Sequence, residues 1–196
     1  MTQMTSGYPF GLEVDAPAAQ NRLSVLLRIF YIIPHMIVLY ILGIVAAIIY
    51  FISWFAILFT GGYPSGMMNF MLNYLHWSTR ANAYLYLLTG QYPPFSMGPD
   101  GAYPVRLAAM GQLEGRNRLT TFWPIRSILA IPHIIVLYIL SIVAGIVLFI
   151  SWIVALFTGS VPAGMHNFLA GVLRWNTRVN AYVLLLTDEY PPFSLS

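Results

Sequence analysis

Two arginines in otherwise uncharged stretches are the residues most able to bind a ligand. Arg80 and Arg178 occupy matching places in the motifs HWSTRANAY and RWNTRVNAY. An arginine inside a membrane helix is costly, so it is a functional candidate by default. We expect anchoring at the membrane interface, where a long side chain reaches phosphates or backbone carbonyls, with binding of an anionic lipid or solute as the alternative. The candidate lipid- or anion-binding residues are Arg80, Arg178, Asn82, Asn180, Asn69 and Asn167.

A second matched pair, His35 and His133, has the chemistry of metal or haem ligands. The two histidines could face each other across an axis that relates two copies of one unit. Each follows a proline near the expected membrane interface, where histidine commonly caps backbone groups, and no carboxylate is in place to orient the ring. We therefore expect no metal and no cofactor, and keep haem or quinone binding as the weaker alternative.

The remaining chemistry argues against an enzyme. The chain has no cysteine, which excludes a catalytic thiol or a thiolate metal site. No serine or threonine has a paired histidine and acid. A proton-coupled transporter and a two-carboxylate hydrolase are disfavoured, and so is a buried ion pair with Arg80 or Arg178 unless a terminal acid folds back, because the acidic residues all lie outside the long apolar segments. They are Glu13, Asp15, Asp100, Glu114, Asp188 and Glu189.

Composition indicates a membrane protein. Hydrophobic residues make up 59% of the 196 residues and charged residues 8%, whereas charged residues are about 25% of soluble domains. The net charge of +3 is small and comes from arginine, so no nucleic-acid partner is expected. The expected partners are the lipid bilayer, a membrane protein or further copies of the chain, and an anionic phospholipid.

The chain consists of two tandem copies of one unit. Residues 28–96 align without a gap on residues 126–194, with roughly 42 of 69 positions identical. The identities include polar residues and helix breakers, as in FISWFAILFTGGYPSG and FISWIVALFTGSVPAG. We place the first unit at residues 1–98 and the second at 99–196.

Each unit is expected to form a helical hairpin, giving an all-α membrane protein with about four transmembrane helices. The apolar segment from Ile29 to Phe59 is followed by a turn and by a second, more polar helix from Met67 to Leu88. The second unit repeats this pattern. Tyrosine-proline segments near Tyr8 and Tyr103 alternate in polarity, and could form short strands.

Two topologies remain open for the polar helices. A hairpin of two spans per unit places most flanking arginines on one membrane face, as the positive-inside rule requires. A single span followed by a helix lying in the interface inverts the second copy and divides the arginines between the two faces. We prefer the hairpin, which predicts a multi-pass protein of the bacterial cytoplasmic membrane with both termini cytoplasmic.

Aromatic and small residues suit packing in either arrangement. Tryptophans at matching positions, Trp54 with Trp152 and Trp77 with Trp175, are typical of interface belts and helix ends. Small residues in the apolar segments would let helices approach closely. These are Gly43, Ala46 and Ala47, matched by Ser141, Ala144 and Gly145.

The run IPH, W-x-x-x-L-F-T-G, P-x-G-M, R/H-W-x-x-R, A-Y and Y-P-P-F-S resembles membrane proteins grouped as domain of unknown function 4389. The similarity covers both units and nearly the whole chain. It implies a helical membrane protein, often with tandem copies, and supplies no activity. The first unit departs from the usual pattern at GGYPSG and HWSTR, so it is expected to bind any shared ligand less well.

These observations favour a non-enzymatic accessory or scaffold subunit that packs against a larger membrane assembly. The alternative is a lipid or small-solute binding or transport protein with a path at the interface between the two units.

Overall fold

The computed structural model describes residues 8–122 and 125–196. The first unit contributes a strand and two helices, and the second contributes a strand, a single helical turn and two further helices. In chain order the elements are β1 (Phe10–Val14), α1 (Arg22–Thr60), α2 (Ser65–Leu85), β2 (Val105–Ala109), α3 (Arg118–Thr121), α4 (Ile125–Thr158) and α5 (Ala163–Val183). The tandem helical units and the short strands are confirmed.

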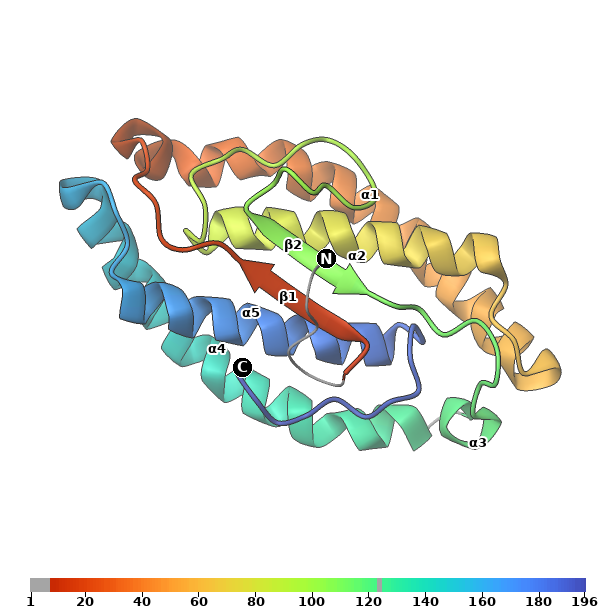
Figure 1. Cartoon of the computed structure of the whole chain (residues 1–196). Helices are drawn as coiled ribbons and strands as arrows, with labels where there is room; N and C mark the ends of the chain where they lie inside the picture. The colour runs from red at the N-terminus through yellow and green to blue at the C-terminus, as the bar shows by residue number, and fades with distance from the viewer. Residues whose placement is uncertain (1–7, 123–124) are drawn as a thin grey trace.

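The elements are arranged in layers (Figure 1). The two strands form an antiparallel ribbon that lies across α2 and α5. The long helices α1 and α4 pass behind α2 and α5, on the side away from the ribbon, and neither contacts a strand. The polar helices α2 and α5 therefore occupy the middle of the molecule.

A pseudo-twofold axis passes through the ribbon. Leu12 pairs with Leu107, and these residues hold equivalent places in the two tyrosine-proline segments. The strand of each unit packs on the second helix of the other unit, β1 on α5 and β2 on α2. Tyr8 donates to the Glu189 carbonyl and Tyr103 donates to the Gln91 carbonyl, so the tyrosine of each unit bonds to the other unit. The boundary between residues 98 and 99 remains a prediction, since the units are interlocked.

Local sequence signals explain where the long helices begin and end. Asn21 accepts hydrogen bonds from two backbone N–H groups at the start of α1, and Asn117 does the same for α3. Gly61 and Gly159 end α1 and α4 in the left-handed conformation, with φ of 76° and 80°. The turns expected after Thr60 and Thr158 are thus confirmed.

The expectation of four transmembrane helices is wrong. Among the described residues, only α1 and α4 are long and apolar enough to cross a membrane, with mean hydropathy of 2.6 and 2.9. Helices α2 and α5 have 21 residues each, enough length for a span. Their sequences are too polar, and their largest faces are buried under the ribbon and against α1 and α4.

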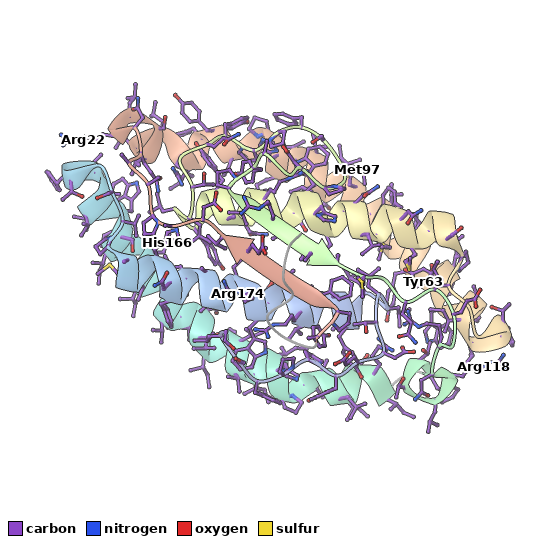
Figure 2. All side chains as sticks on the ribbon, viewed as in Figure 1. Arg22, Tyr63, Met97, Arg118, His166 and Arg174 are labelled. Atoms are coloured by element: carbon purple, nitrogen blue, oxygen red, sulfur yellow. The ribbon has the colours of Figure 1, made fainter. Side chains whose placement is uncertain are left out.

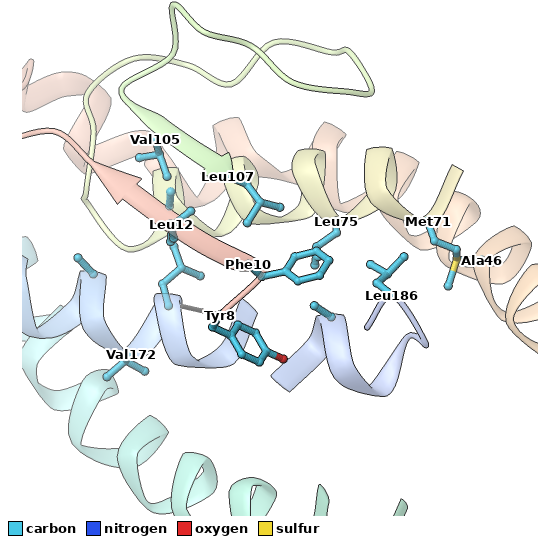
Figure 3. Close-up of a cluster of buried hydrophobic side chains, with 14 of the residues drawn as sticks. Tyr8, Phe10, Leu12, Ala46, Met71, Leu75, Val105, Leu107, Val172 and Leu186 are labelled. Atoms are coloured by element: carbon cyan, nitrogen blue, oxygen red, sulfur yellow. The ribbon is translucent and has the colours of Figure 1, made fainter. Parts of the chain in front are cut away.

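The core lies between the ribbon and the two middle helices (Figure 3). Phe10, Leu12 and Leu107 point from the ribbon toward the middle helices and share one buried cluster with Leu75 of α2 and Val172 of α5. All five side chains are at most 9% exposed. Because alternate residues of a strand point to opposite faces, this leaves the charged residues of the ribbon on its outer side.

Candidate functional site

The two candidate arginines hold the chain segments that follow their helices. Arg80 donates from Nη1 to the Gly98 carbonyl at 2.9 Å and from Nη2 to the Ser96 carbonyl at 2.6 Å. Arg178 donates from Nη2 to the carbonyls of Ser194 and Ser196. Both guanidinium groups are buried, and in both the Nε atom has no partner among the described residues.

The four asparagines of the predicted set do not join these arginines. Asn69, Asn82, Asn167 and Asn180 are exposed, whereas Arg80 and Arg178 are 3% and 2% exposed. Asn82 donates to the Ser78 carbonyl one turn earlier, and Asn180 donates to Asn176. The structure therefore separates the expected cluster, and lipid or anion binding by these residues stays a prediction.

A polar pocket opens beside Arg80 in the first unit. It has a volume of about 180 Å³ and lies between α2 and the segment leading into β2. His76, Thr79, Arg80, Asp100 and Arg106 line it. Burial, together with the charge of Arg80, lowers the pKa of His76 to about 4, so this ring is neutral at pH 7.

The equivalent region of the second unit is filled by an arginine. Arg174 stands where the first unit has His76, and Figure 2 shows it beneath the ribbon. It donates to the Leu12 carbonyl at 2.9 Å and to the Leu195 carbonyl at 3.0 Å. The side chain of His76 is shorter and makes no such hydrogen bond to a backbone carbonyl among the described residues. The pocket lies in the space beside it.

The matched histidines lie in separate aromatic cages. His35 Nδ1 accepts a hydrogen bond from Trp77 Nε1 at 3.0 Å, and its ring stacks on Phe95 with the centroids 3.9 Å apart. Tyr92 packs on the same ring at 4.9 Å. The cage explains why a histidine, a tryptophan and a Tyr-Pro-Pro-Phe segment recur together in the sequence.

The second unit repeats this cage with His133, Trp175, Phe193 and Tyr190. In both cages the Nδ1 atom is occupied by the indole, which places the ring proton on Nε2. That atom is buried and has no hydrogen-bond partner in the described part of the chain, and a protonated nitrogen cannot ligate a metal. No group of three or more histidine, cysteine, aspartate or glutamate residues is poised to hold a metal in the described parts of the chain. Haem binding through these histidines gains no support and stays a prediction.

A third matched pair is also arginine, is buried to a similar extent and was missed as a site by sequence reasoning. Arg28 and Arg126 lie near the start of the long helices and donate to one carbonyl in the last turn of the second helix of each unit and to one just beyond it. Each guanidinium also lies over a tyrosine ring, Tyr84 at 4.2 Å and Tyr182 at 4.4 Å. The signal was present in the sequence, since both arginines are identical in the aligned units.

The second unit adds a buried ion network to this arrangement. The Asp188 carboxylate accepts from Arg126 and from Arg116, the latter at 2.9 and 3.1 Å. Burial lowers the pKa of Arg116, and the charge of Asp188 opposes that shift. A buried ion pair was expected only where a terminal acid folds back, and Asp188 in the C-terminal segment does fold back onto the start of α4.

Two of the tryptophans join the units. Trp54 of α1 donates from Nε1 to the Thr121 carbonyl, and Trp152 of α4 donates to the Val25 carbonyl, at 2.7 and 2.9 Å. These bonds are equivalent under the pseudo-twofold axis. The indoles thus fix α1 to α3 and α4 to the start of α1.

Comparison with known proteins identifies the family and adds no activity. The model of the family described as Domain of unknown function (DUF4389) matches residues 22–97 and 120–194, and the chain belongs to this family. Neither the curated proteins nor the solved structures gave a match. The two matched segments cover the long helices of the two units and the segments after them, and include neither strand.

Proposed function

We propose that this member of a family of unknown function is a non-enzymatic, membrane-embedded accessory subunit. The observation that carries the proposal is the division of the surface into two unlike sides. The long helices α1 and α4 expose almost only apolar side chains, and the opposite side carries the ribbon with Glu13, Asp15 and Arg106. One side suits lipid, and the other suits water or a protein partner.

Several side chains that could take part in catalysis support this proposal, because they form hydrogen bonds inside the fold. The buried arginines bind backbone carbonyls, and His35 and His133 accept from tryptophans. A catalytic site needs a nucleophile, a base and a stabilising group around one reacting atom. The pocket holds the Thr79 hydroxyl, the His76 ring and the Asp100 carboxylate, but no hydrogen bond pairs any two of them among the described residues.

The test is to purify the tagged full chain from its own membranes in a gentle detergent and to identify bound proteins by mass spectrometry. A partner in stoichiometric amount is the expected result. The same tag on an unrelated membrane protein is the control for carry-over. Recovery of the chain alone at several mild detergent concentrations would overturn the accessory role.

The pocket beside Arg80 favours a second candidate function, the binding of an anionic lipid headgroup or small anion. Arg80 supplies positive charge there, and its buried Nε lacks a partner among the described residues, whereas Arg106 is already paired with Asp15. His76→Arg would place in the first unit the side chain that fills the second unit, without removing a charge. This variant should lose bound anionic lipid, with Asn82→Ala as the control on the same helix.

Because Arg80 and Arg178 also hold the segments after their helices, the double variant R80A/R178A needs a check of folding by circular dichroism. Lower lipid content in both His76→Arg and the double variant would support the pocket. Unchanged lipid in both would refute the second candidate.

A further inference from the structure

The exposed surface of α1 is apolar along its whole length. Between Leu23 and Phe59, every exposed residue is aliphatic, phenylalanine, methionine, tyrosine or proline. The buried stripe of the same helix includes Arg28, His35 and Ser53. Helix α4 repeats the pattern, and its one exposed polar residue between Ile128 and Phe157, Ser141, bonds to its own helix. Polar groups inside and apolar groups outside indicate that lipid covers this surface.

The length of the apolar surface does not match an upright span. Helix α1 has 39 residues, or about 58 Å at 1.5 Å per residue, against roughly 30 Å of hydrocarbon. Placing that whole length in the hydrocarbon needs a tilt of about 60° from the membrane normal, beyond the usual limit of about 40°. The exposed residues at its two ends, Leu23 at 59% and Phe59 at 72%, are as apolar as the centre.

The opposite side of the molecule cannot face lipid. Glu13, Asp15 and Arg106 lie on the ribbon, across the middle of α2 and α5. A two-stranded ribbon has an unpaired edge on each strand, and unpaired backbone groups are not tolerated in hydrocarbon. In an upright molecule these groups would lie at the depth of the bilayer centre. Ser78 and Asn82 would lie there too, because they share a groove with Tyr40 and Ile41.

We infer that α1 and α4 lie nearly parallel to the membrane plane, immersed in one leaflet, with the ribbon facing water. This orientation rests on the proposed membrane association and specifies it. The pseudo-twofold axis runs along the membrane normal, so both units meet the same leaflet in the same way. An interfacial helix immerses its apolar face by about 5–10 Å, which suits helices whose other side packs on α2 and α5.

The two exposed arginines at the helix starts suit this orientation. Arg22 and Arg118 lie at opposite ends of the molecule (Figure 2). In the in-plane orientation both stand at the same height and reach the phosphates of one leaflet. In an upright molecule they would lie on opposite membrane faces.

A lipid leaflet fits this surface better than a second copy of the chain does. Protein interfaces are only about 56–65% apolar and carry hydrogen bonds at intervals. The exposed face of α1 offers no side-chain donor or acceptor between Leu23 and Phe59 except the hydroxyls of Tyr31 and Tyr40.

The absence of cysteine allows a direct test with single spin labels on the full chain in vesicles of mixed neutral and anionic phospholipid. Cysteines at Leu26, Ile37, Ile48 and Phe59 are 11 residues apart and share one helix face, since three turns take about 11 residues. Their immersion depths, from oxygen and nickel accessibility, should agree within about 5 Å. Ile135, Ile146 and Phe157 provide the same series on α4, and Asn167→Cys on α5 is the control outside the apolar face.

A profile that is deep at Ile37 and Ile48 and shallow at Leu26 and Phe59 would overturn the in-plane orientation and establish a span. Spin–spin broadening with low accessibility to both reagents would show that a second copy of the chain, and not lipid, covers this surface. An impermeant thiol reagent gives an independent result with Ser65→Cys and Ala163→Cys, at opposite ends of the molecule. Labelling of both from one side supports the inference, and labelling from opposite sides refutes it. Failure to find a protein partner would leave these results unchanged, so the two proposals fail separately.

Discussion

The two units stabilise a buried arginine with different partners. Arg126 of the second unit pairs with Asp188, which also binds Arg116. In the first unit the place of Asp188 is taken by Gly90, and the place of Arg116 is taken by Gln20. There Gln20 accepts from Arg28 at 2.6 Å and donates to the Leu87 carbonyl, so no carboxylate is involved.

This difference separates what the fold requires from what it tolerates. Both units keep the arginine, the two backbone carbonyls that it binds and the tyrosine ring beneath it. Those contacts join the start of the first helix to the end of the second. The counter-charge is dispensable in the first unit because a neutral amide supplies the remaining hydrogen bond. The histidine cages, by contrast, have nearly the same geometry in both units.

The largest effect is expected from Asp188→Asn. This change removes the carboxylate shared by Arg116 and Arg126 and leaves two buried cations side by side. Losing one partner of a buried pair costs about 3–5 kcal/mol. Denaturant unfolding of the detergent-solubilised protein, followed by tryptophan fluorescence, measures the change in the free energy of unfolding.

Glu189→Gln is the matched control for Asp188→Asn, because Glu189 is exposed and adjacent. It should change the stability by less than about 0.5 kcal/mol. An equal effect of the two substitutions would show that the ion network of the second unit contributes nothing beyond the carbonyl contacts shared with the first.

The next largest loss of stability is expected in the histidine cages, where the two units agree. Trp77→Phe and Trp175→Phe each remove the N–H that bonds a buried histidine, while retaining an aromatic ring. A buried acceptor left without a donor costs about 1–3 kcal/mol. Because the two cages have nearly the same geometry, both substitutions should lower the unfolding free energy equally, as measured by the same denaturant titration. A difference above about 1 kcal/mol would contradict the equivalence of the cages.

The sequence predicted the parts of the fold that depend on local pattern. The repeat, the two helices in each unit, the glycine turns at Gly61 and Gly159 and the short strands follow from periodicity and from helix-stopping residues. The number of spans was wrong because a helix of sufficient length was assumed to face lipid. The polar residues of α2 and α5 instead mark helices covered by protein on several sides.

Contacts between distant segments could not be derived from one sequence. The Asp188 network needs the C-terminal segment to return to α4, and the exchange of strands between units leaves no local signal. The identical Arg28 and Arg126 were visible as a matched pair, but they were assigned to membrane topology. Their burial depends on carbonyls at the far end of each unit, 56 and 61 positions away.

A smaller difference between the units should appear at acidic pH. The pKa of His76 is lowered to about 4 in the folded state, by burial and by Arg80, while an unfolded histidine titrates near 6.5. The unfolded chain therefore binds more protons between these values, and stability falls as the pH drops from about 6.5 to 4. We expect His76→Gln to remove about 1–2 kcal/mol of that loss. Unfolding titrations at pH 7 and pH 4.5 measure it, and an unchanged pH dependence would contradict the prediction.

The smallest effect is expected from moving the second unit's network into the first. The double variant Gln20→Arg with Gly90→Asp supplies the equivalents of Arg116 and Asp188 around Arg28. The new charge-assisted hydrogen bonds are partly offset by the cost of burying two more charges, which leaves a gain of about 1 kcal/mol. Gly90→Asp alone is the control, since a Cβ at Gly90 would lie 3.2 Å from Gln20 Cγ and the neighbour would have to shift. If the double variant is no more stable than this control, the amide of Gln20 already stabilises Arg28 as well as a carboxylate stabilises Arg126.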